Sequence, residues 1–341
     1  MSVVNVLHLS DLHFGAEGAK EGNISSAHQR RELIMNGLVD ELKNQTEWVP
    51  HIVVLTGDIA WSAKLSDYDS ARDWLNRLLS ALNLTPRDVV ACPGNHDIDR
   101  EEAKFLRCIV THNDAKDYLA IEQLHRRLPS FQQYVEFAKK LGLVPLENSA
   151  KEKADDLAYL YGTRTHKGLR FISYNSAWAC CGKDDQGKLW IGMPLVEDML
   201  NTLTNSHREI TISLFHHPFS WTHTAEQCVY ELDPAIKNDI INMSDFILNG
   251  HVHGEIKKAD HLEDKAYQLI TGAVYEKKSY RMGCQILKID TGTFTFSTNV
   301  LKYDNANRKW IRDYDQEYLN TSFRTNAPRL TSISIFRSRG R

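Results

Sequence analysis

The chain has 341 residues, of which 42% are hydrophobic and 25% charged, an ordinary composition for a globular protein of one large domain or two small ones. A formal net charge of −3 gives no global positive field, which argues against a large nucleic-acid-binding surface but leaves room for a small site. No apolar run approaches the length of a membrane span, so we expect no membrane interaction.

The first hundred residues alternate strands and helices, a pattern typical of α/β proteins. Residues 3–9 are nearly continuous in apolar side chains, as in a strand buried on both faces, and further strands are expected at 51–56 and 88–91. Apolar residues at helical spacing predict helices over 26–43 and 67–82. These elements predict a layered fold with helices packed on a sheet.

After these elements the alternation stops. Residues 100–145 read as helical throughout, with an apolar stripe at helical spacing, which predicts a helical insertion or cap. Further elements are expected in this order: short strands near 158–161 and at 169–174, a helix over 194–204, and buried strands at 210–215 and 246–248.

The last expected strands lie at 266–271, 283–289 and 293–301 and are consecutive and antiparallel, with a further hairpin within 302–312. No linker rich in Pro, Gly or Ser precedes residue 322, so we expect one domain over residues 1–321.

Residues 322–341 form a tail in which arginines stand among Ser, Thr and Asn: Arg324, Arg329, Arg337, Arg339 and Arg341. Two interpretations are open. A flexible, solvated end is favoured. An electrostatic arm for nucleic acid or for a protein partner is the alternative.

The cysteines and the N-terminus predict a cytoplasmic protein. Six cysteines are scattered without the spacing of a disulfide framework. The chain enters a strand almost at once, without the basic and apolar segments of a signal peptide. The adjacent Cys180 and Cys181 have no Cys-x-x-Cys partner nearby, so a plain pair of loop thiols is favoured over a redox or metal feature.

Polar side chains follow five of the predicted strand ends: Asp11 and His13, Asp58, Asn95 and His96, His216, and His251 and His253. In a layered α/β fold, residues past the carboxyl ends of the strands gather along one edge. Mixed oxygen and imidazole ligands suit divalent ions such as Mn, Fe, Zn or Ni, and no cysteine joins the set as in a structural zinc site. Eight candidates are too many for one ion and suit two, which need a bridging carboxylate and clamp a phosphoryl group.

At these residues the chain resembles the calcineurin-like metallophosphoesterase family, over about residues 3–300. Five short blocks carry the resemblance, in order: Ser10-Asp11-Leu12-His13, Gly57-Asp58, Gly94-Asn95-His96-Asp97, His216-His217-Pro218 and Gly250-His251-Val252-His253. The bacterial phosphodiesterase-type branch is the most similar. The resemblance implies a two-sheet α/β sandwich flanked by helices, with a dimetal site at its edge.

Carried over block by block, the resemblance also implies roles for single residues. The ligands would be Asp11, His13 and His253 for the first ion, Asn95, His216 and His251 for the second, and Asp58 as the bridge. His96 would be an imidazole outside the ligand set that stabilises the transition state or protonates the leaving oxygen, with Asp97 orienting it. His217 would lie behind His216.

Several further residues are candidates for substrate contact: Arg100, His217, Asn175 and His223. For Arg100 an ion pair at the start of a helix is an equal alternative to a substrate phosphate. The loop tryptophans Trp61, Trp178 and Trp221 are open to stacking on a base, although loop anchoring is favoured.

The sequence therefore predicts a dimetal phosphoesterase that hydrolyses a phosphodiester of nucleotide or nucleic-acid type by attack of a metal-bound hydroxide. Mn²⁺ is the favoured ion, with Fe, Zn, Ni and Mg as alternatives. A diester is favoured because the site keeps His96 and an open edge roofed by residues 100–145. The alternatives are a DNA exo- or endonuclease of the double-strand-break-repair type and a catalytically silent protein-binding module. A protein partner would bind through the insertion or the tail.

Overall fold

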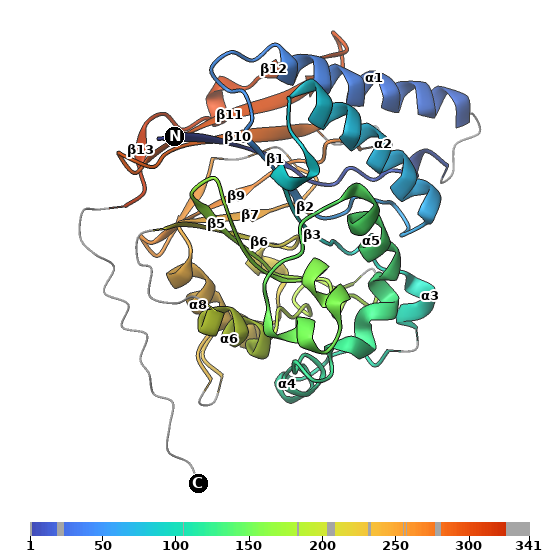
Figure 1. The fold of residues 1–341 in the computed structure, drawn as a ribbon, viewed down its shortest axis with the longest axis vertical. Helices are drawn as coiled ribbons and strands as arrows, with labels where there is room; N and C mark the ends of the chain where they lie inside the picture. Colours follow the sequence, from blue (N-terminus) through green and yellow to red (C-terminus); the bar gives the residue numbers. More distant parts are fainter. Residues whose placement is uncertain are drawn as a thin grey trace.

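The computed structural model describes residues 2–18, 24–104, 106–182, 184–202, 209–230, 233–254, 256, 258–276 and 281–324. Two mixed β-sheets face each other, and helices cover their outer faces (Figure 1). The predicted α/β class, a two-sheet sandwich flanked by helices, is confirmed.

The first sheet has the strand order β12-β11-β10-β1-β2-β3, with β13 paired to β11. Its strands are β1 (Val3–Leu9), β2 (Ile52–Thr56), β3 (Val89–Cys92), β10 (Gly283–Asp290), β11 (Thr295–Asp304), β12 (Lys309–Arg312) and β13 (Thr321–Ser322). Strands β1, β2 and β3 run parallel, so their carboxyl ends lie at one edge of the sheet. The hairpin predicted within 302–312 is the β11–β12 pair.

The second sheet has the order β4-β5-β6-β7-β9-β8. Its strands are β4 (Gly162–His166), β5 (Leu169–Ser173), β6 (Ile210–Leu214), β7 (Phe246–Asn249), β8 (Asp260–Leu262) and β9 (Ala266–Ile270). The four strands β5, β6, β7 and β9 are parallel, while β4 and β8 are antiparallel edge strands.

Two predictions for this region are wrong. Strand β9 pairs with β7 in parallel and not with β10, because an apolar alternation marks a strand without identifying its partner. The apolar run at 158–161 is not a strand. A 3₁₀ helix, Asp155–Tyr159, buries part of it, and β4 begins after it.

The core has two parts because the side chains of each strand alternate between its two faces. On β1, Val4 and Val6 enter the core between the sheets, where they join Phe171 and Phe246. Leu7 points the other way, toward the helices. Helices α1 (Ile24–Lys43) and α2 (Leu65–Ala81) cover the first sheet, and α6 (Met193–Thr202) and α8 (Ile236–Met243) cover the second (Figure 1).

The region predicted as helical throughout consists of separate helices, so that prediction is wrong in its detail. They are α3 (Arg100–Ala103), α4 (His112–Tyr118), a 3₁₀ turn (Leu124–Arg127) and α5 (Leu128–Leu141). Capping explains the breaks: Asp99 and Thr111 accept hydrogen bonds from the first turns of α3 and α4, and Gly142 ends α5 at φ 88°. Helix α5 packs on α2, with Phe137 stacked on Tyr68 at 5.1 Å. That this region acts as a cap stays a prediction.

Shorter elements connect the larger ones. Further 3₁₀ turns span Ala16–Gly18, Pro86–Asp88, Ser149–Glu152, Phe219–Trp221 and Tyr314–Gln316, and α7 is the single turn Thr224–Gln227. Helix α7 carries the buried Glu226, whose carboxylate accepts hydrogen bonds of 2.8 Å from the backbone N–H groups of Ile191 and Gly192. This carboxylate holds α7 against the loop that precedes α6.

A disulfide joins Cys108, in the loop between α3 and α4, to Cys181. The sequence predicted no disulfide, because two cysteines 73 residues apart do not have the spacing of a disulfide framework. Both residues are exposed, and Cys180 has a free thiol. The pairing ties the predicted insertion to the loop after β5.

The described chain stays packed to its last residues. Phe323 is buried between the sheets, and Arg324 forms an ion pair of 2.6 Å with Asp245, so the packed part extends slightly past the predicted boundary at 321. The other arginines of the tail lie outside the described residues. In the parts of the chain that the structure describes, no helix combines the length and the apolar character needed to cross a membrane.

Candidate metal centre

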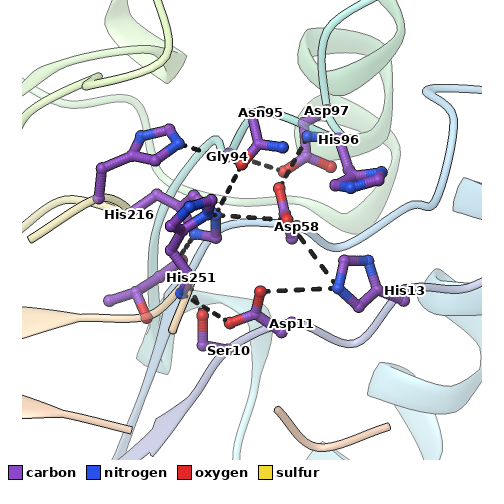
Figure 2. A network of polar contacts seen from close by, with 12 residues as sticks. Ser10, Asp11, His13, Asp58, Gly94, Asn95, His96, Asp97, His216 and His251 are labelled. Atoms are coloured by element: carbon purple, nitrogen blue, oxygen red, sulfur yellow. Dashed lines mark hydrogen bonds and ion pairs between the residues drawn. The ribbon is translucent and has the colours of Figure 1, made fainter. Parts of the chain in front are cut away.

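Five loops bring their polar side chains to one edge of the sandwich (Figure 2). The loops follow the carboxyl ends of β1, β2 and β3 in the first sheet and of β6 and β7 in the second. They carry, in chain order, Asp11 and His13, Asp58, Asn95 and His96, His216 and His217, and His251 and His253. Figure 2 shows Asp58 between His13 on one side and His216 and His251 on the other.

The backbone of these loops takes a conformation that side chains disfavour. Asp11, His13, Asp58 and His251 have φ values of 54°, 47°, 53° and 70°. Left-handed residues other than glycine cost about 1–3 kcal/mol each and persist where the surroundings hold them. Here backbone hydrogen bonds do so, from Asp11 N–H to the Gly57 carbonyl at 3.1 Å and from His13 N–H to the Asp58 carbonyl at 3.0 Å.

Two glycines allow the loops to approach each other closely. A Cβ on Gly94 would overlap the carboxylate of Asp58, and a Cβ on Gly250 would overlap the side chain of Ser10. Only a residue without a side chain fits at either position. The motif glycines are therefore required for the convergence of the acidic and imidazole groups.

The first cluster consists of Asp11, His13, Asp58 and His253, whose ligand atoms all lie within 4.8 Å of one another. The His253 Nε2 atom lies 2.8 Å from Asp11 Oδ1 and 3.1 Å from His13 Nε2. The His13 Nε2 atom lies 3.6 Å from Asp11 Oδ1 and 3.9 Å from Asp58 Oδ2. Ligands bound about 2.1 Å from one cation are separated by roughly 3–3.5 Å, so these four residues fit a single divalent ion.

The second cluster consists of His216, His217 and His251, with the amide oxygen of Asn95 among their nitrogens. Asn95 Oδ1 lies 3.2 Å from His216 Nε2 and 3.1 Å from His217 Nε2, and His251 Nδ1 lies 3.2 Å from His216 Nε2. Asp58 Oδ2 is 3.3 Å from His216 Nε2, so the carboxylate that belongs to the first cluster also reaches the second. His217, expected behind His216, lies beside it with its Nε2 in the cluster.

Burial keeps three of the imidazoles neutral. It lowers the pKa of His13 to about 3 and that of His251 to about 4, and it lowers the pKa of His217 as well. A neutral imidazole has a lone pair to give to a cation. The three side chains are therefore in the protonation state that a ligand needs.

The carboxylates are held ionised against the effect of burial. Burial by itself raises the pKa of both Asp11 and Asp58. The neighbouring imidazoles, chiefly His253 for Asp11 and His216 for Asp58, lower the pKa by more than burial raises it, so both values lie below that of an ordinary carboxyl. The pKa of His253 shows the reverse balance, since burial lowers it and Asp11 and Glu276 raise it to about 11. A cation at His253 Nε2 would replace the proton there.

Residues outside the clusters orient two of the imidazoles. His253 Nδ1 lies 2.7 Å from a carboxylate oxygen of Glu276, and His216 Nδ1 donates to the Thr56 carbonyl at 2.6 Å. Each bond fixes the ring so that Nε2 faces the cluster. Glu276 was not predicted from the sequence, because it lies in the loop after β9 and belongs to no motif.

His96 lies beside Asp58 at the edge of the first cluster. Its backbone N–H donates to Asp58 Oδ1 at 2.8 Å, and its ring Nδ1 lies 2.6 Å from the carbonyl oxygen of Trp61. The ring packs edge-on to that of His13, with 4.9 Å between centroids. A backbone carbonyl, and not a carboxylate, therefore orients this imidazole.

The carboxylate of Asp97 lies among backbone N–H groups of two neighbouring loops. It accepts hydrogen bonds from the backbone N–H groups of Ile59, Ala60 and Gly94 and from the hydroxyl of Tyr68. None of its hydrogen bonds in the described structure goes to the ring of His96. Asp97 instead joins the loop that carries Asp58 to the loop that carries Asn95.

The remaining candidates belong to neither cluster. Arg100 is exposed at the start of α3. Asn175 is buried and accepts from the N–H of Ala177, and its Nδ2 has no partner in the described structure. His223 caps α7 and stacks on Trp190 at 4.3 Å.

The sequence model of the calcineurin-like phosphoesterase family matches residues 4–255. A protein of Bacillus subtilis (strain 168) described as "Uncharacterized metallophosphoesterase-like protein YydB" is 23% identical over 310 residues, which cover 88% of this chain and 59% of that protein. The chain thus spans about three fifths of the length of this relative.

Many solved structures also match, at low sequence identity. A dimetal phosphatase from Danio rerio shares 12% identity, with 93% of this chain and 98% of that chain covered and a TM-score of 0.47. Vps29 from Entamoeba histolytica, complexed with Zn²⁺, shares 11% identity, with 91% and 98% covered and a TM-score of 0.37.

Proposed function

The chain belongs to the calcineurin-like phosphoesterase family, whose members are metal-dependent hydrolases of phosphoesters, and on that basis we propose that it hydrolyses phosphodiesters of nucleotide or nucleic-acid type with two divalent cations. The position of Asp58 carries this proposal. One carboxylate oxygen lies 3.3 Å from His216 Nε2 and 3.9 Å from His13 Nε2, as a group shared by two ions requires.

The donor atoms fit the proposed cations. Asp58 would be shared, and the other ligands would be Asp11, His13 and His253 on one side and Asn95, His216 and His251 on the other. His217 is an additional donor on the second side. Bound there, two cations would neutralise charge on the phosphoryl oxygens and make a water molecule acidic enough to serve as nucleophile. Mixed carboxylate, amide and imidazole donors favour Mn²⁺, with Fe, Zn, Ni and Mg as alternatives.

His96 supplies the proton for the leaving group. Its Nδ1–H donates to a backbone carbonyl, so when both ring nitrogens carry a proton the Nε2–H is the one that can pass to the leaving oxygen, and the ring is left neutral with its proton on Nδ1. The leaving group of the ester departs as an alkoxide or phenolate unless it is protonated. A proton donor at this point therefore lowers the barrier most for leaving groups of high pKa.

Hydrolysis of two chromogenic esters tests the proposal. Protein stripped with a chelator and reloaded with Mn²⁺ should hydrolyse bis-p-nitrophenyl phosphate with a higher kcat/KM than p-nitrophenyl phosphate. Equal or reversed values would contradict the diester assignment. Cleavage of end-labelled DNA at a comparable rate would favour the nuclease alternative.

A further inference from the structure

We propose that Trp61 is a positioning residue that holds the imidazole of His96 in its working orientation. The inference rests on the proposed function, in which His96 protonates the leaving oxygen. It adds a second residue to the protonation of the leaving oxygen. This residue lies in the loop after β2 and outside the five motif blocks.

Trp61 contacts His96 in two independent ways. Its carbonyl oxygen lies 2.6 Å from His96 Nδ1 and therefore accepts the proton of that nitrogen. Its indole stacks on the imidazole, with 4.5 Å between ring centroids and 27° between the ring planes. The hydrogen bond selects the tautomer, and the stack stops the ring from rotating about that bond. Together the two contacts fix the direction of Nε2.

Trp61 is itself held firmly, so it can act as a support. Its backbone N–H donates to the Phe14 carbonyl at 2.8 Å, which fastens it to the loop after β1. Its indole is partly buried against the core and meets the ring of His13 edge-on, at 5.1 Å and 74°. The indole thus contacts both His13 and His96, whose rings also meet each other edge-on at 4.9 Å, so the three rings form one packed group.

The magnitude of the effect follows from the step that it supports. A positioned general acid accelerates a reaction by about 10²–10⁴-fold, and a displacement of the acid by about 1 Å can lose about 10²-fold. Loss of the stack alone leaves the backbone hydrogen bond in place. We therefore expect kcat to fall by about 10–100-fold without the indole, and never by more than removal of His96 itself.

The alternative task for Trp61 is to stack on a base of the substrate. The ring face toward His96 is already covered by the imidazole. A platform for a base would act on substrate binding, and its loss would raise KM. Loss of a positioning residue would lower kcat and leave KM nearly unchanged. The two tasks are thus separated by kinetics.

Two substitutions isolate the indole. Trp61→Phe keeps an aromatic ring, and Trp61→Leu keeps much of the volume without one. Each is measured alone and combined with His96→Asn, at saturating Mn²⁺, on aryl phosphodiesters that release phenol or p-nitrophenol. Trp221→Leu is the matched control, because this half-buried tryptophan meets His251 of the second cluster at 4.0 Å. Circular dichroism and metal content confirm the fold of each variant.

We expect Trp61→Leu to lower kcat about 10–100-fold for release of phenol, clearly less for release of p-nitrophenol, with KM within about twofold, and Trp61→Phe to retain most activity. In the His96→Asn background the same change should alter kcat less than about threefold. Trp221→Leu should leave the ratio between the two leaving groups unchanged. Equal losses in both backgrounds, or a change in KM alone, would overturn the proposal.

A spectroscopic readout separates failure of this proposal from failure of the proposed function. In protein labelled with ¹⁵N at histidine, the neutral ring of His96 should report the Nδ1–H tautomer in both proteins, because the backbone carbonyl of residue 61 remains, and Trp61→Leu should shift and broaden the His96 signals because the ring gains mobility without the stack. Unchanged signals in Trp61→Leu would contradict the positioning role even in an active enzyme. Wild-type protein without Mn²⁺-dependent esterase activity but with the expected change of signals would instead overturn the proposed function alone.

Discussion

Removal of the Asp97 carboxylate tests whether this residue is a structural tie or a partner of His96. The carboxylate is fully buried and accepts hydrogen bonds from the N–H groups of Ile59, Ala60 and Gly94. The hydroxyl of Tyr68 donates to it at 2.9 Å. Asp97→Ala deprives all four donors of their acceptor. Asp97→Asn keeps the volume and one oxygen but turns an NH₂ group toward backbone N–H donors.

The expected cost follows from the number of donors left without a partner. A buried donor that loses its acceptor costs about 1–3 kcal/mol, and water that enters the space left by the side chain recovers part of this. For Asp97→Ala, with four donors left unpaired, we therefore expect the free energy of unfolding to fall by about 3–6 kcal/mol. For Asp97→Asn, which keeps one oxygen as an acceptor, we expect a fall of about 1–3 kcal/mol. Domains of this kind have a free energy of unfolding of about 5–15 kcal/mol in total, so the alanine variant should be only marginally folded.

Urea unfolding at pH 7.5 in the presence of EDTA measures this cost without a contribution from metal binding. Asp73→Ala, on the exposed face of α2, is the control and should change the free energy of unfolding by less than about 0.5 kcal/mol. The reasoning is refuted if both Asp97 variants lose less than about 1 kcal/mol while kcat falls as far as in His96→Asn. Asp97 would then orient His96, as the sequence first suggested.

Three further predictions concern residues outside the two clusters. Glu276→Ala should weaken Mn²⁺ binding, measured by calorimetry, about 10–100-fold because it releases the ring of His253. Glu276→Gln, which keeps an acceptor, should weaken it less. Equal affinities in the wild-type protein and both variants would exclude this role. Burial raises the pKa of Glu226 from 4.5 to about 8, so the folded protein binds more protons than the unfolded chain between these values. The free energy of unfolding should therefore fall as the pH rises through this window, by up to roughly 5 kcal/mol, and Glu226→Gln should remove that slope in urea titrations at pH 5 and 8.5; a rise with pH attributable to Glu226 would contradict the assignment. Reduction of the Cys108–Cys181 bridge, which closes a separation of 73 residues, should lower the free energy of unfolding by about 2–4 kcal/mol. Cys108→Ser should not respond to the reductant, and a wild-type midpoint that is the same with and without reductant would show that the bridge contributes nothing.

The parts of the fold that could be predicted from the sequence are those that depend on the residue types of a short segment. Apolar runs marked β1 and β6 because their strands are buried on both faces, and motif glycines such as Gly94 marked the turns where loops must approach closely. The sheet partner of β9 was not predicted, since alternation gives the face of a strand and not its neighbour.

Long-range contacts outside the motifs carried no local signal. The carboxylate of Glu276 and the carbonyl of Trp61 reach the site from positions outside the five motif blocks. The pairing of Cys108 with Cys181 depends on how the α3–α4 loop lies against the loop after β5. The motif identified Asp97 as a candidate site residue. Which groups its carboxylate binds depends on the arrangement of neighbouring N–H groups, which the motif does not contain.

Anomalous diffraction from a manganese-soaked crystal measures directly whether the Asp58 carboxylate is shared by two cations. We expect two anomalous peaks about 3.5–4 Å apart, one on each side of Asp58, and a loss of both or of one in Asp58→Asn. A single peak that does not involve Asp58, or no peak within reach of His13 and His216, would contradict this sharing.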